Sequence, residues 1–175
     1  VSKIGQLSMI AGKGEVIEAA GGMNFSAETG LFVSNPLSIN GDATFDVAAF
    51  NVQQDITTTN GGNIEIKSNE LNFDQASSIT SAGQLILPVI VAKNDLTLIA
   101  ASTLKLNTVE ITGGDLVLDA GSGTLDIQGS ILASNNVTML AGDVNINNTI
   151  AEIDAGGTVK FSDQHDGGTG VGLDG

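Results

Sequence analysis

The only histidine of the chain, His165, stands between Asp163 and Asp166 in a glycine-rich acidic stretch. A Ser-His-Asp site needs a nucleophile held in place and a pocket that excludes water. A glycine-rich stretch without an apolar period provides neither, so we expect His165 to lie in a solvated tail. We therefore assign no catalytic residue and expect no enzyme activity.

The same stretch contains a sequence that resembles a calcium-binding turn. Residues 166–174 are similar to a single nonapeptide turn of the Gly-Gly-x-Gly-x-Asp type, but Gly172 stands where that pattern has its Asp. One repeat alone cannot build the shared site, so we expect no cofactor and no bound metal. Calcium is kept as an alternative, because Asp and Asn oxygens in turns are the ligands it prefers.

Acidic and amide side chains elsewhere in the chain could meet if successive segments stack. Asp126 with Asn145, or Asp55 with Glu65, are the pairs to consider. Glycoside cleavage needs two carboxylates across a groove, and sugar binding generally uses exposed Trp or Tyr. The chain has no Trp, Tyr or Arg. A carbohydrate-active enzyme is therefore the less favoured alternative.

The charge balance excludes two classes of partner. There are 20 acidic residues and 6 basic ones, for a formal net charge of -14. Nucleic acids and anionic membrane surfaces bind through Lys and Arg, so we expect neither as a partner. The apolar run at 85–92 is too short to span a membrane, and the absence of Cys excludes disulfides and thiol catalysis.

Apolar residues recur in three series at a spacing of about twenty, which indicates stacked coils of one repeating unit. The first series is Phe25, Phe45, Ile66, Leu87, Leu106, Ile127 and Ile146; the second is Val33, Val52, Phe73, Val91, Ile111, Ile131 and then Ile150 or Ile153; the third is Ile39, Ile56, Ile79, Leu98, Leu118, Met139 and Phe161. Most members end an apolar-x-apolar triplet such as residues 64–66, and that local period of two predicts strands.

Together these patterns predict an all-β fold, a right-handed parallel β-helix with three short strands per coil and about 7 to 8 coils. The rod is expected over residues 1–162, with an irregular first coil around Ile4, Leu7, Val16 and Ile17, and a tail over residues 163–175. In each triplet the flanking residues should point inward and the middle residue outward.

Most outward positions are polar, and the exceptions form our candidate interaction surface. These exceptions are Phe32, Ile86, Ile90 and Val117, of which Ile86 and Ile90 flank Pro88. Outward apolar side chains mark either a partner surface or a strip covered by a loop. The sequence does not separate these two alternatives.

Several phrases resemble the degenerate repeats of filamentous-haemagglutinin-like exoproteins of two-partner secretion. They are NDLTLIA at 94–100, GDLVLDAG at 114–121 and NVTMLAG at 136–142. The segment LFVSNP at 31–36, followed by Asp46 and Val47, is similar to the Asn-Pro segment of that family's secretion domain, although Leu37 and Ser38 stand where the family often has Asn-Gly. Autotransporter passengers share the repeat pattern, which covers residues 23–161.

The resemblance implies a secreted or cell-surface, right-handed β-helical stalk from a Gram-negative bacterium, acting in adhesion, biofilm formation or toxin presentation. We therefore expect a non-catalytic stalk or adhesive segment whose partner is a host or neighbouring-cell surface. The alternative is an extracellular fibre subunit that stacks end to end on its own copies through open strand edges. We expect the chain to be a mature product or a segment of a longer protein.

Overall fold

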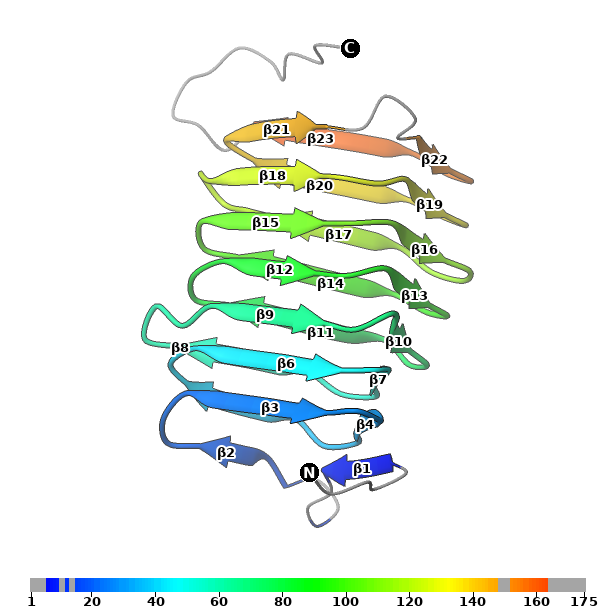
Figure 1. The fold of residues 1–175 in the computed structure, drawn as a ribbon. Coiled ribbons are helices and arrows are strands. Elements are labelled where there is room, and N and C mark those ends of the chain that lie inside the picture. The colour runs from blue at the N-terminus through cyan, green and yellow to red at the C-terminus, as the bar shows by residue number, and fades with distance from the viewer. Residues whose placement is uncertain (1–5, 10–11, 13–14, 148–151, 164–175) are drawn as a thin grey trace.

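A computed structural model of the protein shows a right-handed parallel β-solenoid of about seven turns (Figure 1). It describes residues 6–9, 12, 15–147 and 152–163. None of these residues is helical, and their strands form three sheets that run along the rod. The predicted fold class is confirmed, including three short strands in each coil.

Each sheet collects one strand from successive coils. Sheet A contains β1 (Gln6–Met9), β4 (Gly30–Val33), β7 (Phe50–Val52), β10 (Leu71–Phe73), β13 (Ile90–Ala92), β16 (Val109–Ile111), β19 (Ile131–Ala133) and β22 (Ile153–Ala155). Sheet B contains β2 (Ile17–Ala19), β5 (Leu37–Asn40), β8 (Ile56–Thr59), β11 (Ser77–Ser81), β14 (Leu96–Ala100), β17 (Leu116–Asp119), β20 (Val137–Ala141) and β23 (Val159–Asp163). Sheet C contains β3 (Met23–Ala27), β6 (Ala43–Val47), β9 (Ile64–Lys67), β12 (Leu85–Leu87), β15 (Thr103–Leu106), β18 (Thr124–Ile127) and β21 (Asp143–Ile146).

The right-handed sense of the solenoid can be read from the directions of its strands. In Figure 1 the chain rises from the N-terminus, the sheet C strands run to the right in front, and the sheet B strands run to the left behind. This is the right-handed sense favoured for connections between parallel strands.

The interior consists of stacked rows of aliphatic side chains. In sheet B, for example, Ile79, Leu98 and Leu118 are register partners in consecutive strands, and each has an exposed fraction of 0%. Phe45 and Phe50 add a ring contact with centroids 5.0 Å apart. Each coil packs only against its neighbours, and the same arrangement of inward side chains repeats along the rod.

The corner at Pro88 corrects the predicted facing of two residues. Pro88 and Val89 both belong to the turn between β12 and β13, so the alternation restarts at Ile90. Ile90 points inward with an exposed fraction of 0%, and its neighbour Val91 is the outward residue of β13. Our prediction that Ile90 points outward, and that Val91 belongs to an inward row, is therefore wrong.

The second predicted series also joins two separate inward rows of sheet A, because Ile111 and Ile131 lie in different rows. One row passes through Val52, Phe73, Ala92, Ile111 and Ala133, and the other through Phe50, Leu71, Ile90, Val109 and Ile131. The latter row continues to Ile153, whereas Ile150 lies outside the described residues.

A buried polar corner interrupts the apolar rows where sheet B meets sheet C. Thr58 and Ser81 are 2% exposed and stand at inward positions of β8 and β11. The Thr58 hydroxyl donates to the Gly62 carbonyl at 2.7 Å and accepts the Ala82 N–H at 3.1 Å. The Ser81 hydroxyl lies 3.0 Å from the same Gly62 oxygen and 2.7 Å from the Gln84 carbonyl oxygen. The Thr58 hydroxyl thus supplies partners for the Gly62 carbonyl and the Ala82 N–H, which lie in the turns between the two sheets.

Close stacking of the corners explains one of the glycines. A Cβ on Gly123 would overlap the carbonyl oxygen of Ser102 in the preceding coil. Glycine at this position lets the two corners approach one another, so its role here is a close backbone contact.

The first and last described coils are less buried than the coils between them. Ile146 is 37% exposed, and Ile17, Phe25 and Phe161 are only partly buried. Each of these coils has a described neighbour on one side only, so its inward side chains are incompletely covered. Strand β23 runs to Asp163; Ile4 and residues 164–175, which include His165 and the calcium-like turn, lie outside the described residues.

Candidate functional site

The outer face of sheet C carries a row of mostly polar side chains. One outward side chain from each coil forms a row parallel to the rod axis, namely Asn24, Thr44, Glu65, Ile86, Lys105, Asp126 and Asn145. All except Ile86 are polar, as the period of two predicts. The row brings Asp126 beside Asn145, which confirms one of the two predicted stacked pairs.

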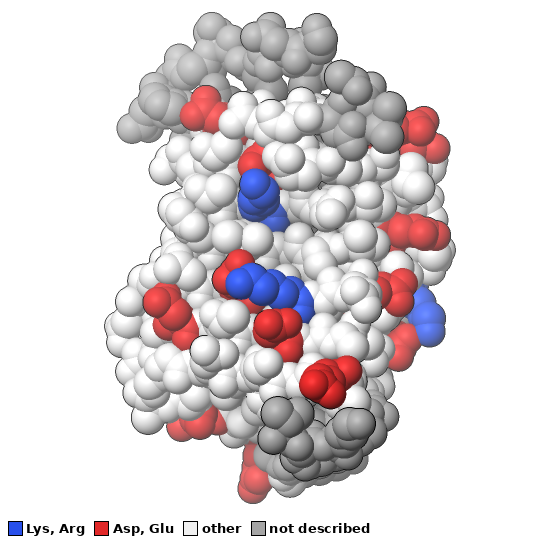
Figure 2. Space-filling view, viewed as in Figure 1, with Lys and Arg blue, Asp and Glu red and all other residues white. Residues whose placement is uncertain are grey.

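Ion pairs connect the charges of this face. Lys67 Nζ lies 3.2 Å from a Glu65 carboxylate oxygen, and Lys105 Nζ lies 3.5 Å from one of Asp126. Figure 2 shows basic side chains beside acidic ones on the side viewed in Figure 1. Because the Lys67 and Glu65 side chains are 56% and 38% exposed, this pair contributes at most about 1 kcal/mol.

A hollow of about 540 Å³ lies where sheet C turns toward sheet A. Its polar lining comes from residues at or near the ends of β3, β6 and β9, namely Glu28, Asp46, Lys67, Ser68 and Asn69. The hollow is shallow and open to solvent. It therefore presents carboxylate, ammonium and amide groups to a ligand without enclosing it.

A second hollow, of about 250 Å³, lies at the opposite edge of the face, where Asp42, Asn63 and Gln84 precede β6, β9 and β12. Ile86 supplies an apolar part of its lining. Asp42 Oδ1 accepts hydrogen bonds from Asn63 N at 2.8 Å and Asn63 Nδ2 at 3.0 Å, and Asn63 Oδ1 accepts one from Gln84 N at 2.7 Å. Much of this wall is thus engaged in holding successive coils together.

The four residues of the predicted interaction surface do not form one patch. Phe32 is the outward residue of β4 in sheet A, Ile86 of β12 in sheet C and Val117 of β17 in sheet B. Ile90 is buried in the interior. Ile86 lines the hollow of about 250 Å³, so it is the member of the set that we retain for the site.

The second predicted acidic pair is not supported by the topology. Asp55 precedes β8 of sheet B, whereas Glu65 lies in β9 of sheet C, paired with Lys67. Among the described residues, no three His, Cys, Asp or Glu side chains gather closely enough to hold a metal ion.

A polar ladder at the corner between sheets A and B was not anticipated from the sequence. Asp55 Oδ1 accepts the Ser78 N–H at 2.7 Å, and Asp95 Oδ1 accepts the Asp115 N–H at 2.8 Å. Asp115 Oδ1 in turn accepts from Asn136 N at 3.1 Å. The sequence does contain a pattern that could have predicted this ladder, since an Asp or Asn stands directly before the triplets that begin at 56, 96, 116 and 137. These acidic residues cap the backbone of the next coil as well as carrying charge.

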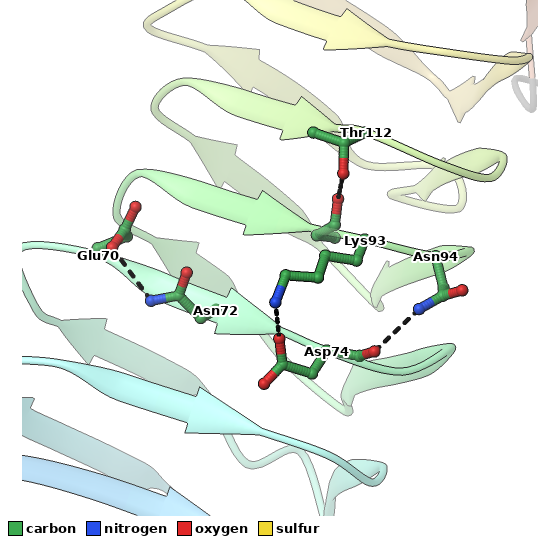
Figure 3. Close-up of polar contacts among 7 residues, drawn as sticks. Glu70, Asn72, Asp74, Lys93, Asn94 and Thr112 are labelled. Atoms are coloured by element: carbon green, nitrogen blue, oxygen red, sulfur yellow. Dashed lines mark hydrogen bonds and ion pairs between the residues drawn. The ribbon is translucent and has the colours of Figure 1, made fainter.

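Figure 3 shows further polar contacts close to this corner, made by residues in or next to the sheet A strands β10, β13 and β16. Lys93 Nζ contacts Asp74 Oδ1 at 2.6 Å, and Asn94 Nδ2 donates to the Asp74 carbonyl at 2.9 Å. Within one coil, Asn72 Nδ2 donates to Glu70 at 3.2 Å. The side chains of Lys93 and Asp74 are 66% and 44% exposed, so their role is to connect neighbouring coils at the surface.

Comparison with models of known protein families, with curated proteins and with solved structures gives no match for this chain. Within the part of the chain that the structure describes, no helix has the length and apolar character needed to cross a membrane.

The chemistry available on the sheet C face is hydrogen bonding and ion pairing. Its charged groups are partly exposed, and several oppose one another in pairs. The sequence contains no Trp or Tyr that could offer a stacking surface for a sugar ring. The arrangement is suited to contact with an extended polar surface over several coils.

Proposed function

We propose that the protein is a non-catalytic structural segment of a large secreted or cell-surface bacterial exoprotein, in which it acts as a stalk or adhesive rod. The observation that supports this most is the uninterrupted repetition of one three-sheet cross-section from coil to coil. The resemblance of residues 94–100, 114–121 and 136–142 to filamentous-haemagglutinin-like repeats is consistent with the same role.

A solenoid is suited to this role for a physical reason. Each coil adds roughly 4.8 Å of length, and its backbone hydrogen bonds run along the rod axis. The rod can therefore become longer by adding coils with the same kind of interior, because each coil buries its apolar rows against its neighbours. The polar outer faces remain available for contact with another surface.

Attachment of protein-coated microspheres to cultured animal cells and to bacterial cells tests the adhesive form of this proposal. We expect attachment above that of albumin-coated microspheres. If the hollow of about 250 Å³ that Ile86 lines takes part, Ile86→Thr should reduce this attachment. Val91→Thr is the matched control, because Val91 is an outward apolar residue on sheet A.

A parallel assay separates the proposal from its enzymatic rival. The purified protein is incubated with a panel of bacterial and plant polysaccharides, and new reducing ends or unsaturated products are measured. We expect none. Release of such products that is lost in Glu65→Gln would contradict a non-catalytic role.

The strand edges of the first and last coils favour a second function, assembly of a fibre from copies stacked end to end. In sheet C one inward row begins at Met23 and ends at Val144, and another begins at Phe25 and ends at Ile146. If copies stacked end to end, Val144 of one copy would meet Met23 of the next, and Ile146 would meet Phe25. In sheet B the row that begins at Ile17 ends at Phe161. Each of these junctions would place apolar residues together.

Sedimentation and electron microscopy distinguish a fibre from a single rod. If copies stack, uniform filaments form, and Ile146→Lys abolishes them by placing a charge at the junction. Leu132→Lys is the control, because Leu132 has the same 37% exposed fraction but lies on the side of the rod. Monomeric rods at high protein concentration would leave the stalk as the function.

A further inference from the structure

Two Asn–Gly dipeptides lie one above the other at the corner between sheets B and C. Asn40-Gly41 ends β5 and enters the turn, and Asn60-Gly61 follows β8 one coil later. The two asparagines are in contact, because Asn60 Nδ2 donates a hydrogen bond to Asn40 Oδ1 at 2.5 Å. Both asparagine side chains are exposed to solvent.

An Asn–Gly dipeptide carries the groups for a modification that needs no enzyme. The backbone nitrogen of glycine attacks the asparagine Cγ, a C–N bond forms, and the side-chain nitrogen leaves as ammonia. Water then opens the resulting succinimide ring at either carbonyl, giving aspartate or isoaspartate. The reaction needs a backbone N–H that is free to lose its proton and a following residue without a Cβ in the way.

Asn60-Gly61 meets these requirements. Among the described residues no acceptor takes the Gly61 N–H, since the hydrogen bond that closes the turn runs from Gly62 N to Thr59 O at 3.0 Å. Asn60 and Gly61 have φ values of 54° and 72°, which are typical of a type I′ turn projecting from the rod. A Cβ built on Gly61 would meet nothing within 4 Å, so space around the nitrogen is open.

Asn40-Gly41 has the same sequence but a different environment. The Gly41 N–H donates to the Thr59 carbonyl of the next coil at 3.3 Å. A Cβ on Gly41 would lie 3.4 Å from the Gly22 nitrogen of the preceding coil. The coils on both sides therefore restrain the Gly41 nitrogen, whereas the Gly61 N–H has no acceptor among the described residues.

We propose that Asn60 is a site of spontaneous deamidation in the folded protein, and that Asn40 is protected from the same reaction by coil stacking. The aspartate product adds a negative charge that faces Asn40, whose amide can turn so that Nδ2 donates to it. The isoaspartate product instead adds one methylene to the backbone of the tight turn. Either product changes the chain chemically at one defined corner of the rod.

The test is a time course of the folded protein at mildly alkaline pH, followed by cleavage before Asp residues and tandem mass spectrometry. Cleavage before Asp42 and Asp55 places Asn40 and Asn60 in separate peptides. We expect conversion at Asn60 to exceed that at Asn40 several-fold. Isoaspartate at residue 60 is detected separately by enzymatic methyl transfer to its carboxylate.

The denatured protein is the matched control. In denaturant both glycine nitrogens are free, so the two dipeptides should react at similar rates and the difference should disappear. Equal or faster conversion of Asn40 in the folded state would overturn the proposal. So would conversion of Asn60 no faster than that of Asn63, which is followed by isoleucine.

Discussion

At the scale of single residues, the direction in which a side chain points determines the cost of changing it. Ile66 and Leu118 are 3% and 0% exposed, so Ile66→Asp or Leu118→Asp places a charge inside a stacked aliphatic row. We expect losses of several kcal/mol in the free energy of unfolding. Glu65→Ala and Thr97→Ala, at neighbouring outward positions, should cost about 0.5 kcal/mol or less. Chemical denaturation of the four variants checks this order, and the reverse order would contradict the inward rows.

The pair Ile86 and Ile90 gives a sharper test, because these residues belong to one apolar run but face opposite ways. Ile90→Thr should lower the free energy of unfolding by about 1 to 3 kcal/mol, since it puts a hydroxyl into the interior. Ile86→Thr removes an outward side chain from the wall of a hollow, so its effect on stability should be small. Equal losses for both variants, measured by urea denaturation, would show that Pro88 and Val89 do not shift the alternation.

The facing of most residues could be predicted from the sequence, because a period of two repeats wherever a triplet is intact. Leu116 to Asp119, for example, alternates between inward and outward as expected. The prediction failed at 88–91, where every residue is apolar and the pattern contains no signal for where one strand ends. The resulting shift of one residue reverses the side to which each side chain points.

At the scale of elements, the corner between sheets B and C depends on the Thr58 hydroxyl. Thr58→Val keeps the shape of the side chain but removes the bonds to Gly62 O and Ala82 N. We expect a loss of about 1 to 3 kcal/mol, because the partly buried Ala82 N–H loses its acceptor and the buried Thr58–Gly62 bond is lost. Thr57→Val is the control on the same strand, since Thr57 points outward. Thermal or urea unfolding that ranks the two variants equally would show that the buried bonds contribute little.

The corners, in contrast to the strands, could be predicted only in part. Glycine and Asn indicated where turns occur, but which turns stack depends on the register between coils. The ladder through Asp95, Asp115 and Asn136, and the hollow near Asp42, result from residues about 20 positions apart meeting across coils. The number of residues in a coil varies, as the pairs Leu71 with Ile90 and Val109 with Ile131 show. A fixed period therefore does not predict which turn residues meet.

At the scale of the whole molecule, the rod should accept the removal of a complete coil. Leu104 pairs with Leu85, so deleting residues 85–103 places β15 on β9 with apolar residues still inside and Lys105 beside Glu65. We expect a folded rod that is shorter by roughly 4.8 Å. Because the chain has no Cys, spin labels at Glu18→Cys and Lys160→Cys can report the distance between the two ends.

A deletion of about half that length is the control that makes this prediction decisive. Removing residues 85–95 brings β14 directly after Gln84, in the place of β12, and leaves a coil that cannot close around the interior. We expect it to lose cooperative unfolding and the β-sheet circular dichroism spectrum, since its neighbours lose their partners in all three sheets. If both deletions unfold the protein, stability depends on contacts beyond nearest neighbours. If both are tolerated, the register between coils does not determine the fold.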